Sequence, residues 1–159
     1  MVESSEFAKK AITIAIRYAC VRRQFGSSPD GTGHEEELKI MDYQTHQKRL
    51  IPLLAYTYAC CFTASHVRIV FSEQEQKLNS IGPDTPLEEL LEVVSILKDV
   101  HGTSAGLKAF CTWRTLNLIE ECRQSLGGLG YSSYTGLASL FADFAVECTW
   151  EVINSSLVD

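Results

Sequence analysis

Three groups of residues in this chain are of types that bind cofactors or move protons. The run Arg22-Arg23-Gln24-Phe25-Gly26 contains guanidinium groups, which can bind phosphate oxygens through two hydrogen bonds at once. Gln124 is followed by Gly127 and Gly128, where an amide side chain can hydrogen-bond to a cofactor and bare backbone can approach it closely. Glu151 is a carboxylate whose basicity would rise if it were buried beside an apolar ligand. These types predict anion binding and proton abstraction.

Each group also has an explanation that needs no ligand. Two arginines near the end of a helix complement the helix dipole. A glycine pair after a helix can simply cap it. Because no strand precedes these glycines, they are not a dinucleotide-binding fingerprint. Glu147, one helical turn before Glu151, is a rival base on spacing alone.

Length and composition favour one folded domain that covers residues 1–159. The chain is 45% hydrophobic and 21% charged, as in ordinary globular proteins. Its net charge of -6 and its lack of Lys and Arg clusters argue against nucleic-acid binding. No unbroken apolar run reaches the roughly 18 residues of a membrane helix, and the polar start is not a signal peptide. The sequence therefore predicts an intracellular protein that does not bind a membrane.

The cysteines and histidines do not have the spacing of metal ligands. The six cysteines include no CxxC pair and lie mostly in apolar helical stretches, so we expect reduced thiols in the core and neither a zinc site nor a disulfide framework. The four histidines are also spaced unlike metal ligands, and no metal site is predicted. The cysteines are Cys20, Cys60, Cys61, Cys111, Cys122 and Cys148.

Apolar residues recur at helical intervals in the first half of the chain. The pattern predicts a helix over residues 5–23 and a long helical stretch over residues 36–78. Pro52 lies inside that stretch and is a candidate kink. Between the two, residues 26–33 concentrate turn formers and are expected to form an exposed loop.

The start of a third helix has the strongest local signal. Thr85 can cap it, Pro86 suits the first helical position, and Glu88 completes a Thr-x-x-Glu capping box. We expect this helix to continue to Leu126.

The last part of the pattern completes a helical fold. Gly102 and Gly106 are expected to let a neighbouring helix approach closely or to allow a bend. After a loop over residues 127–136, a shorter helix is predicted over residues 137–149. No segment has the period of a strand, so the sequence predicts an all-α protein, an antiparallel helical bundle.

The order and spacing of the three chemical groups resemble the acyl-CoA dehydrogenase/oxidase family from about residue 8 to residue 151. Three features are more similar to peroxisomal acyl-CoA oxidases than to mitochondrial dehydrogenases: the paired Arg22-Arg23-Gln24, residues 41–47 followed by 50–55, and Cys148-Thr149-Trp150-Glu151. The resemblance implies a bundle like the first C-terminal helical domain of that family.

The resemblance also implies FAD as the cofactor and a homodimer. In the family, the first arginine of the Arg-x-Gln-Phe-Gly element reaches the FAD pyrophosphate of the partner subunit, and that role falls on Arg22. The Gln-x-x-Gly-Gly turn lines the adenosine side of FAD. The residues that the resemblance assigns to FAD are Arg22, Gln24, Phe25, Gln124, Gly127 and Gly128.

The reaction that the resemblance implies is oxidation of an acyl-CoA to trans-2-enoyl-CoA in fatty-acid β-oxidation. Glu151 would remove the pro-R α-proton of the thioester while the β-hydrogen leaves as hydride to flavin N5. An oxidase then passes the electrons to dioxygen and releases hydrogen peroxide. The family also implies a peroxisomal location, although the final residues 157–159 are not a peroxisomal address.

The family pattern breaks after Glu151. Relatives continue with glycine and then Asn or Thr, whereas residues 152–159 here form a divergent tail. A full oxidase also has an N-terminal helical domain, a β-domain and a second C-terminal helical domain. We therefore expect the isolated chain to be inactive, as a truncated product or a read-through beyond an exon boundary. The alternatives to an oxidase fragment are an inactive module that retains dimerisation or partial FAD binding, a dehydrogenase-type fragment, and an unrelated helical interaction domain.

Overall fold

The computed structural model describes residues 1–26, 37–83 and 85–150, and within them the fold is all-α, with packed helices and no strand. The all-α prediction is therefore confirmed. Four short 3-10 helices accompany the α-helices of the described part. The elements are α1 (Val2–Val21), η1 (Ile40–Asp42), α2 (Gln44–Ser80), α3 (Leu87–Ser125), η2 (Gly127–Tyr131), η3 (Ser133–Thr135), α4 (Leu137–Ala145) and η4 (Val146–Cys148).

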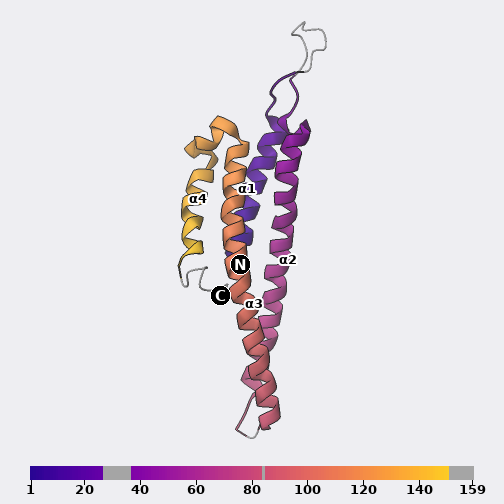
Figure 1. Cartoon of the computed structure of the whole chain (residues 1–159), viewed down its shortest axis with the longest axis vertical. Helices are drawn as coiled ribbons and strands as arrows, with labels where there is room; N and C mark the ends of the chain where they lie inside the picture. The colour runs from indigo at the N-terminus through magenta and orange to yellow at the C-terminus, as the bar shows by residue number, and fades with distance from the viewer. Residues whose placement is uncertain (27–36, 84, 151–159) are drawn as a thin grey trace.

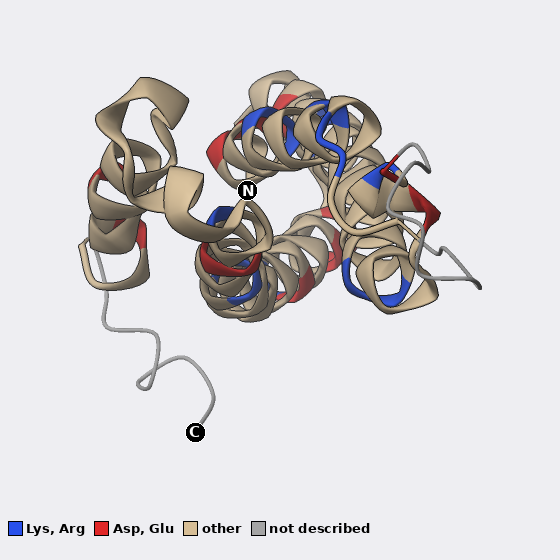
Figure 2. Ribbon diagram, turned by 90° about the horizontal axis from the view of Figure 1, so that it is seen from above, with Lys and Arg blue, Asp and Glu red and all other residues tan. Residues whose placement is uncertain are grey.

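Successive α-helices run in opposite directions, which makes the bundle antiparallel (Figure 1). α2 and α3 are 37 and 39 residues long, and α1 has 20, so α2 and α3 extend well past the N-terminus as a two-helix hairpin (Figure 1). α4 packs against the second half of α3, to one side of the three long helices (Figure 2). Acidic and basic residues are spread around the bundle, as Figure 2 also shows.

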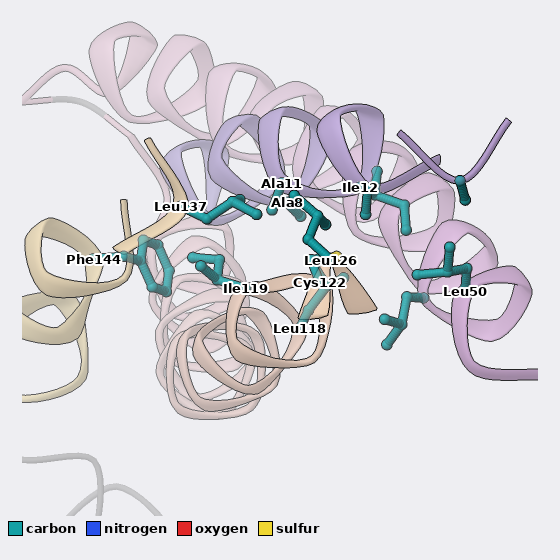
Figure 3. Packing of buried hydrophobic residues seen from close by; sticks show 13 residues of the cluster. Ala8, Ala11, Ile12, Leu50, Leu118, Ile119, Cys122, Leu126, Leu137 and Phe144 are labelled. Carbon is teal, nitrogen blue, oxygen red and sulfur yellow. The ribbon is translucent and has the colours of Figure 1, made fainter. Parts of the chain in front are cut away.

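The core lies where all four α-helices meet (Figure 3). Alanines recur on the buried face of α1 with helical spacing, and their small side chains let α2 and α3 pack closely against it. α3 contributes Leu118, Ile119 and Cys122, and α4 adds Phe144, whose ring centroid is 5.0 Å from that of Phe7. Each buried Leu, Ile or Phe stabilises the fold by about 1.5–3 kcal/mol relative to exposure. The core alanines are Ala8, Ala11, Ala15 and Ala19.

α2 carries several exposed apolar side chains. Ile51, Tyr58, Phe62 and Ile69 are each more than half exposed and recur at helical spacing. By length and composition α2 could cross a membrane, a possibility that counting only unbroken apolar runs had missed. Only 28% of its most apolar window is buried, although α2 packs against α1 and α3. One such helix is weak evidence for a membrane span.

The start of α2 differs from the prediction. The helix begins at Gln44 and not near residue 36, because Leu38 and Lys39 pair with the segment after α1 and residues 40–42 form η1. The Gln24 amide donates to the Leu38 carbonyl (2.9 Å), and the Leu38 amide donates to the Phe25 carbonyl (3.0 Å). α2 then continues through Pro52 to Ser80. The predicted loop at residues 26–33 lies, apart from Gly26, outside the described residues.

The predicted capping box of the third helix is wrong. The Thr85 hydroxyl accepts a hydrogen bond from the Gly82 amide (2.9 Å), on the side of the preceding turn, and Pro86 occupies the N-cap position of α3 without a side-chain cap. Of the two expectations for Gly102 and Gly106, the close approach of a neighbouring helix is wrong. A Cβ atom at either position would meet nothing within 4 Å.

The cysteines are free, as the sequence predicted, but they are not all in the core. Cys20 is exposed and Cys61 is half-buried, whereas Cys60, Cys111, Cys122 and Cys148 are buried. Within the described ranges, no group of three or more His, Cys, Asp or Glu side chains could hold a metal ion.

Candidate cofactor-binding site

The first predicted group forms a short extended segment after α1. The helix ends at Val21, and Arg22 has extended backbone angles (φ -67°, ψ 126°). The Ile40 amide donates to the Arg22 carbonyl (2.9 Å), and the Tyr43 hydroxyl donates to the carbonyls of Gln24 (2.9 Å) and Phe25 (3.1 Å). These bonds hold the segment by its backbone.

Phe25 is unusual in both conformation and exposure. Its φ of +56° lies in the left-handed region, which non-glycine residues rarely adopt. Its side chain is 70% exposed, so burial of the ring does not compensate for this backbone strain. Strained backbone of this kind is concentrated at ligand-binding sites.

The arginines of this segment differ in their contacts. The Arg23 guanidinium donates to the Glu37 carbonyl (2.8 Å). The Arg22 guanidinium is exposed, and within the described ranges it has neither a hydrogen-bond partner nor an ion-pair partner. Arg22 therefore keeps its full capacity to bind an anion, whereas Arg23 helps to hold the extended segment in place.

The glycine turn begins where α3 ends. The fold requires glycine at some of its positions and not at others. Gly127 has a φ of +60°, a conformation that glycine adopts without strain. A Cβ atom at Gly130 would collide with the carbonyl oxygen of Arg123, so that position needs glycine for packing. Gly128 has no positive φ and nothing within 4 Å of a built Cβ atom. Nothing in this fold therefore requires a glycine at position 128.

An ion pair at the end of α3 holds Gln124. The Glu120 carboxylate accepts two hydrogen bonds from the Arg123 guanidinium (2.7 and 2.6 Å) and one from the Gln124 amide (2.8 Å). The hydrogen bonds from Arg123 hold the pKa of Glu120 below its usual range. Arg123 also lies over the Tyr131 ring, 5.0 Å from its centroid. The Gln124 side chain is exposed, and its carbonyl oxygen can accept a further hydrogen bond.

The structure brings the predicted cofactor-binding residues together, although about 100 positions separate the two groups in the sequence. They line two adjacent hollows at one end of the bundle, of about 370 and 480 Å³. Gln24 and Gly127 line both hollows. Phe25 and Gln124 line the first, and Arg22 and Gly128 line the second.

Three residues of the first hollow were not predicted to have a functional role. Tyr43, His46 and Arg49 come from the start of α2. Burial, and secondarily the positive charge of Arg49, lower the pKa of His46. Its buried Nε2 atom has no hydrogen-bond partner within the described part of the chain. The family-like run at residues 41–47 includes Tyr43 and His46, and it was the only signal in the sequence for either of them.

Glu147, the candidate base that the structure describes, belongs to the other end of the bundle. Glu151 lies outside the described residues, but the carbonyl of the preceding Trp150 accepts a hydrogen bond from Lys108 Nζ (3.0 Å). Burial raises the pKa of Glu147, and the nearby Glu3 carboxyl raises it further. Glu3 is in the first turn of α1, whereas Arg22 follows its last turn. A helix of 20 residues is about 30 Å long, so Glu147 is far from the cofactor-binding group.

Comparison with known proteins places these features in one family. The model of the acyl-CoA oxidase C-alpha1 domain matches residues 1–158. Acyl-coenzyme A oxidase 2 of Yarrowia lipolytica is 47% identical over 155 residues, which cover 98% of this chain and 21% of that protein. Peroxisomal acyl-coenzyme A oxidase 1 of Bos taurus is 38% identical over 156 residues, with coverages of 98% and 21%.

Solved structures agree with this assignment. The crystal structure of acyl-CoA oxidase 1 from Yarrowia lipolytica superimposes with a TM-score of 0.88 at 44% identity, covering 97% of this chain and 22% of that one. Acyl-CoA oxidase-2 of Caenorhabditis elegans, bound with FAD, ascaroside-CoA and ATP, gives 0.83 at 29% identity, with coverages of 99% and 22%. The chain thus spans about a fifth of the length of its relatives. It belongs to the acyl-CoA oxidase family, as the C-alpha1 domain.

Proposed function

We propose that this chain is the FAD-binding helical domain of an acyl-CoA oxidase, which oxidises acyl-CoA to trans-2-enoyl-CoA and reduces dioxygen to hydrogen peroxide in fatty-acid β-oxidation. The observation that carries the proposal is the convergence of the two predicted groups on adjacent hollows at one end of the bundle. The C. elegans relative, whose structure contains FAD, supports the choice of cofactor. Its ascaroside-CoA supports acyl-CoA as the substrate class.

The residues at this end of the bundle fit FAD. Arg22 would bind the pyrophosphate with a guanidinium that has no other partner within the described ranges, and phosphate accepts its paired hydrogen bonds well. Gln124 would hydrogen-bond on the adenosine side, and the open space at Gly128 would let the cofactor contact the backbone. When bound, FAD supplies the hydride-accepting chemistry.

The separation of the two ends favours a homodimer. About 30 Å of helix separates Arg22 from Glu3 and Glu147. A side chain cannot bridge that distance, so we propose that Arg22 of one subunit serves the FAD of its partner. Because Gln124 and Gly128 line the hollows beside Arg22, the base of each subunit would then act at the FAD that these residues of its partner contact.

Glu151 is the proposed base, because it is the glutamate in the family-like Cys148-Thr149-Trp150-Glu151 context. It would remove the α-proton of the thioester as the β-hydrogen leaves as hydride. Glu147 is the second candidate, because burial raises the pKa of its carboxyl and makes it a better base. A Glu→Gln substitution at each position separates the two, since only the true base should be needed for substrate-dependent flavin reduction.

Coverage of only about a fifth of each relative favours a second proposal, that the isolated chain binds part of FAD or dimerises without catalysing. We also propose a peroxisomal location, on the strength of the name of the bovine relative.

Electron acceptors distinguish an oxidase from a dehydrogenase-type protein. Peroxide release with dioxygen alone supports the oxidase, whereas turnover that needs an added dye contradicts it.

A chimera tests the assignment, with this chain replacing the matching fifth of Yarrowia lipolytica acyl-CoA oxidase 1. Arg22→Ala should weaken FAD binding about tenfold to a hundredfold, because it removes charge-assisted hydrogen bonds. Arg68→Ala, at an exposed arginine of α2, is the matched control and should leave FAD binding unchanged. Equal FAD affinity in both variants would contradict the role of Arg22.

Complementation tests the shared site. At an FAD concentration too low to load the Arg22→Ala chimera, the Arg22→Ala and Glu151→Gln chimeras should each be inactive, but a mixed dimer would contain one site with an intact arginine and an intact base. Random reassociation of equal amounts should therefore restore about a quarter of wild-type activity. If mixing restores nothing although mixed dimers form, the two residues act within one chain.

A further inference from the structure

The Glu120 carboxylate fixes the orientation of a side chain that lines the cofactor-binding hollows. It accepts one hydrogen bond from Gln124 Nε2 (2.8 Å) and two from the Arg123 guanidinium (2.7 and 2.6 Å). An ionised carboxylate only accepts hydrogen bonds, so a flipped Gln124 amide would place its carbonyl oxygen against the Glu120 oxygens and be repelled. The Gln124 amide therefore has one orientation, with Nε2 toward Glu120 and Oε1 away from it.

Arg123 keeps Glu120 ionised and in place. Its hydrogen bonds are the largest cause that holds the pKa of Glu120 below the usual carboxyl range. The Arg123 and Glu120 side chains are only 18% and 30% exposed. Arg123 is fixed in turn by the glycine turn, because its guanidinium lies over the Tyr131 ring and its carbonyl oxygen packs against Gly130. The fold itself thus anchors the group that orients Gln124.

The remaining hydrogen-bonding groups of Gln124 are available to a ligand. Gln124 lines the first hollow, of about 370 Å³. Within the described ranges Oε1 has no hydrogen-bond partner, and Nε2 keeps the second of its two hydrogens. An acceptor and a donor lie side by side, and Glu120 prevents them from exchanging places. Such a pair is complementary to a ligand edge that carries a donor beside an acceptor.

Adenine has an edge of this kind. Its 6-amino group donates and the neighbouring ring nitrogen accepts, and a glutamine amide can bind both at once. A 6-oxopurine such as hypoxanthine has a carbonyl oxygen in place of the amino group, so it offers an acceptor where adenine offers a donor. An amide that is free to turn over can adapt to a changed edge, whereas an amide held in one orientation cannot.

We propose that Glu120 is a positioning residue that makes the FAD site of this chain selective for adenine over a 6-oxopurine. Gln124 Oε1 accepts from the 6-amino group, and Nε2 donates its remaining hydrogen to the adjacent ring nitrogen. With a 6-oxo base, Oε1 meets a carbonyl oxygen, and repulsion replaces the hydrogen bond. The inference rests on the proposed function, which puts the adenosine side of FAD beside Gln124.

The experiment compares two flavins in the chimera with Yarrowia lipolytica acyl-CoA oxidase 1. Flavin hypoxanthine dinucleotide differs from FAD only at the 6-position of the purine. We expect FAD to bind the wild-type chimera about fivefold to a hundredfold more tightly, as for one paired amide–base contact. In Glu120→Gln the new amide can donate as well as accept, so Gln124 can adopt either orientation and the two affinities should agree to within about twofold.

The ratio of the two affinities separates positioning from structural support. If Glu120 only stabilises the end of α3, Glu120→Gln should weaken both flavins equally and keep the wild-type ratio, which would overturn the proposal. Glu121→Gln is the matched control, because Glu121 is the next residue and pairs with Arg114 (4.0 Å) outside this network; it should keep the wild-type ratio. If Glu120→Gln fails to fold by circular dichroism, Glu120→Asp replaces it, since a shorter carboxylate stays charged but withdraws from Gln124.

Nuclear magnetic resonance of the full chain without FAD tests the contact by itself. The side-chain amide signals of Gln124, assigned by their loss in Gln124→Ala, should move in Glu120→Gln and stay in place in Glu121→Gln. Unmoved signals in Glu120→Gln would show that Glu120 does not hold the amide. A chimera that needs Arg22 for FAD binding but does not prefer FAD to the hypoxanthine dinucleotide would contradict this inference alone. A chimera that binds neither flavin would contradict the proposed function, and the selection of adenine with it.

Discussion

The three glycines of the turn after α3 should respond differently to the same substitution. Gly127→Ala should cost about 1 kcal/mol of stability, because an L-residue is strained at a φ of +60°, and the smaller unfolded-chain entropy of alanine offsets this strain only in part. Gly130→Ala should cost about 1–3 kcal/mol or more, because the added methyl group meets the Arg123 carbonyl oxygen, which cannot swing away. Gly128→Ala adds a methyl group in open space within η2, and should leave stability unchanged or raise it by about 0.5 kcal/mol.

Gly128→Ala, the substitution expected to affect stability least, should nevertheless weaken FAD binding. If the cofactor contacts the backbone there, a methyl group removes about one hydrogen bond, and FAD binding to the chimera should weaken about fivefold to tenfold. Urea unfolding followed by circular dichroism measures stability, and fluorescence titration measures FAD affinity. Equal destabilisation by Gly127→Ala and Gly128→Ala would refute the structural reasoning. Unchanged FAD affinity in Gly128→Ala would refute the role of this glycine in cofactor binding.

Three further predictions concern the fold. Glu147→Gln should raise the melting temperature at neutral pH. The fold raises the pKa of Glu147, so ionisation of this carboxyl destabilises the folded wild type as pH rises past the ordinary carboxyl pKa, and the glutamine avoids this cost. The difference in melting temperature should disappear below about pH 4. Glu120→Gln should lower the melting temperature at neutral pH, since Arg123 depresses the pKa of Glu120, and the loss should vanish as pH falls through the folded-state value. Leu118→Ala, at a fully buried position, should cost about 2–5 kcal/mol in urea unfolding, whereas Leu91→Ala, at a side chain 61% exposed, should cost less than about 0.5 kcal/mol.

The helices were predictable because their signals are local. The apolar spacing of α1 and α3 reports a buried face directly, and both helices lie within a few residues of their predicted bounds. The start of α2 was not predictable in this way. The apolar pattern continues through residues 37–39, but their backbone groups pair with the segment after α1. That segment is distant in the sequence and meets residues 37–39 only in the folded chain.

The prediction of the helix cap at Thr85 was wrong for a related reason. The Thr85 hydroxyl has two possible donors within reach, the amides of the coming helix and the amide of Gly82, and the sequence pattern considers only the first. The turn before α3 brings the Gly82 amide to the Thr85 hydroxyl, so the hydrogen bond forms with Gly82 and not with the helix. Cys20 was assigned to the core from the apolar residues around it, yet it falls on the exposed face of α1, next to the buried Ala19.

The cofactor-binding group was predicted from the family resemblance, and its juxtaposition is a consequence of the bundle. The end of α1 and the end of α3 lie at the same end because α1 and α3 run in the same direction, separated by the antiparallel α2 (Figure 1). Tyr43 and Arg49 join them because the start of α2 is at that end as well. The helix ends come together because of the directions and lengths of the helices, which the apolar pattern predicts. Which residues of α2 join them depends on how each helix is rotated about its axis, and the apolar pattern predicts this rotation only in part.

Several local features at this end are unexplained by the stability of the domain itself. Phe25 is in a strained conformation with its ring in solvent, Arg22 has no partner among the described residues, and Gly128 has no steric need to be glycine. By contrast, Gly127, Gly130 and the Glu120–Arg123 pair each have a reason in the fold. A helical module selected only to fold or to present a face would have no need to keep the first set of features together on adjacent hollows. A bound cofactor would account for all three at once, because it can contact an exposed ring, pair with a free guanidinium and occupy the space that a side chain at position 128 would fill.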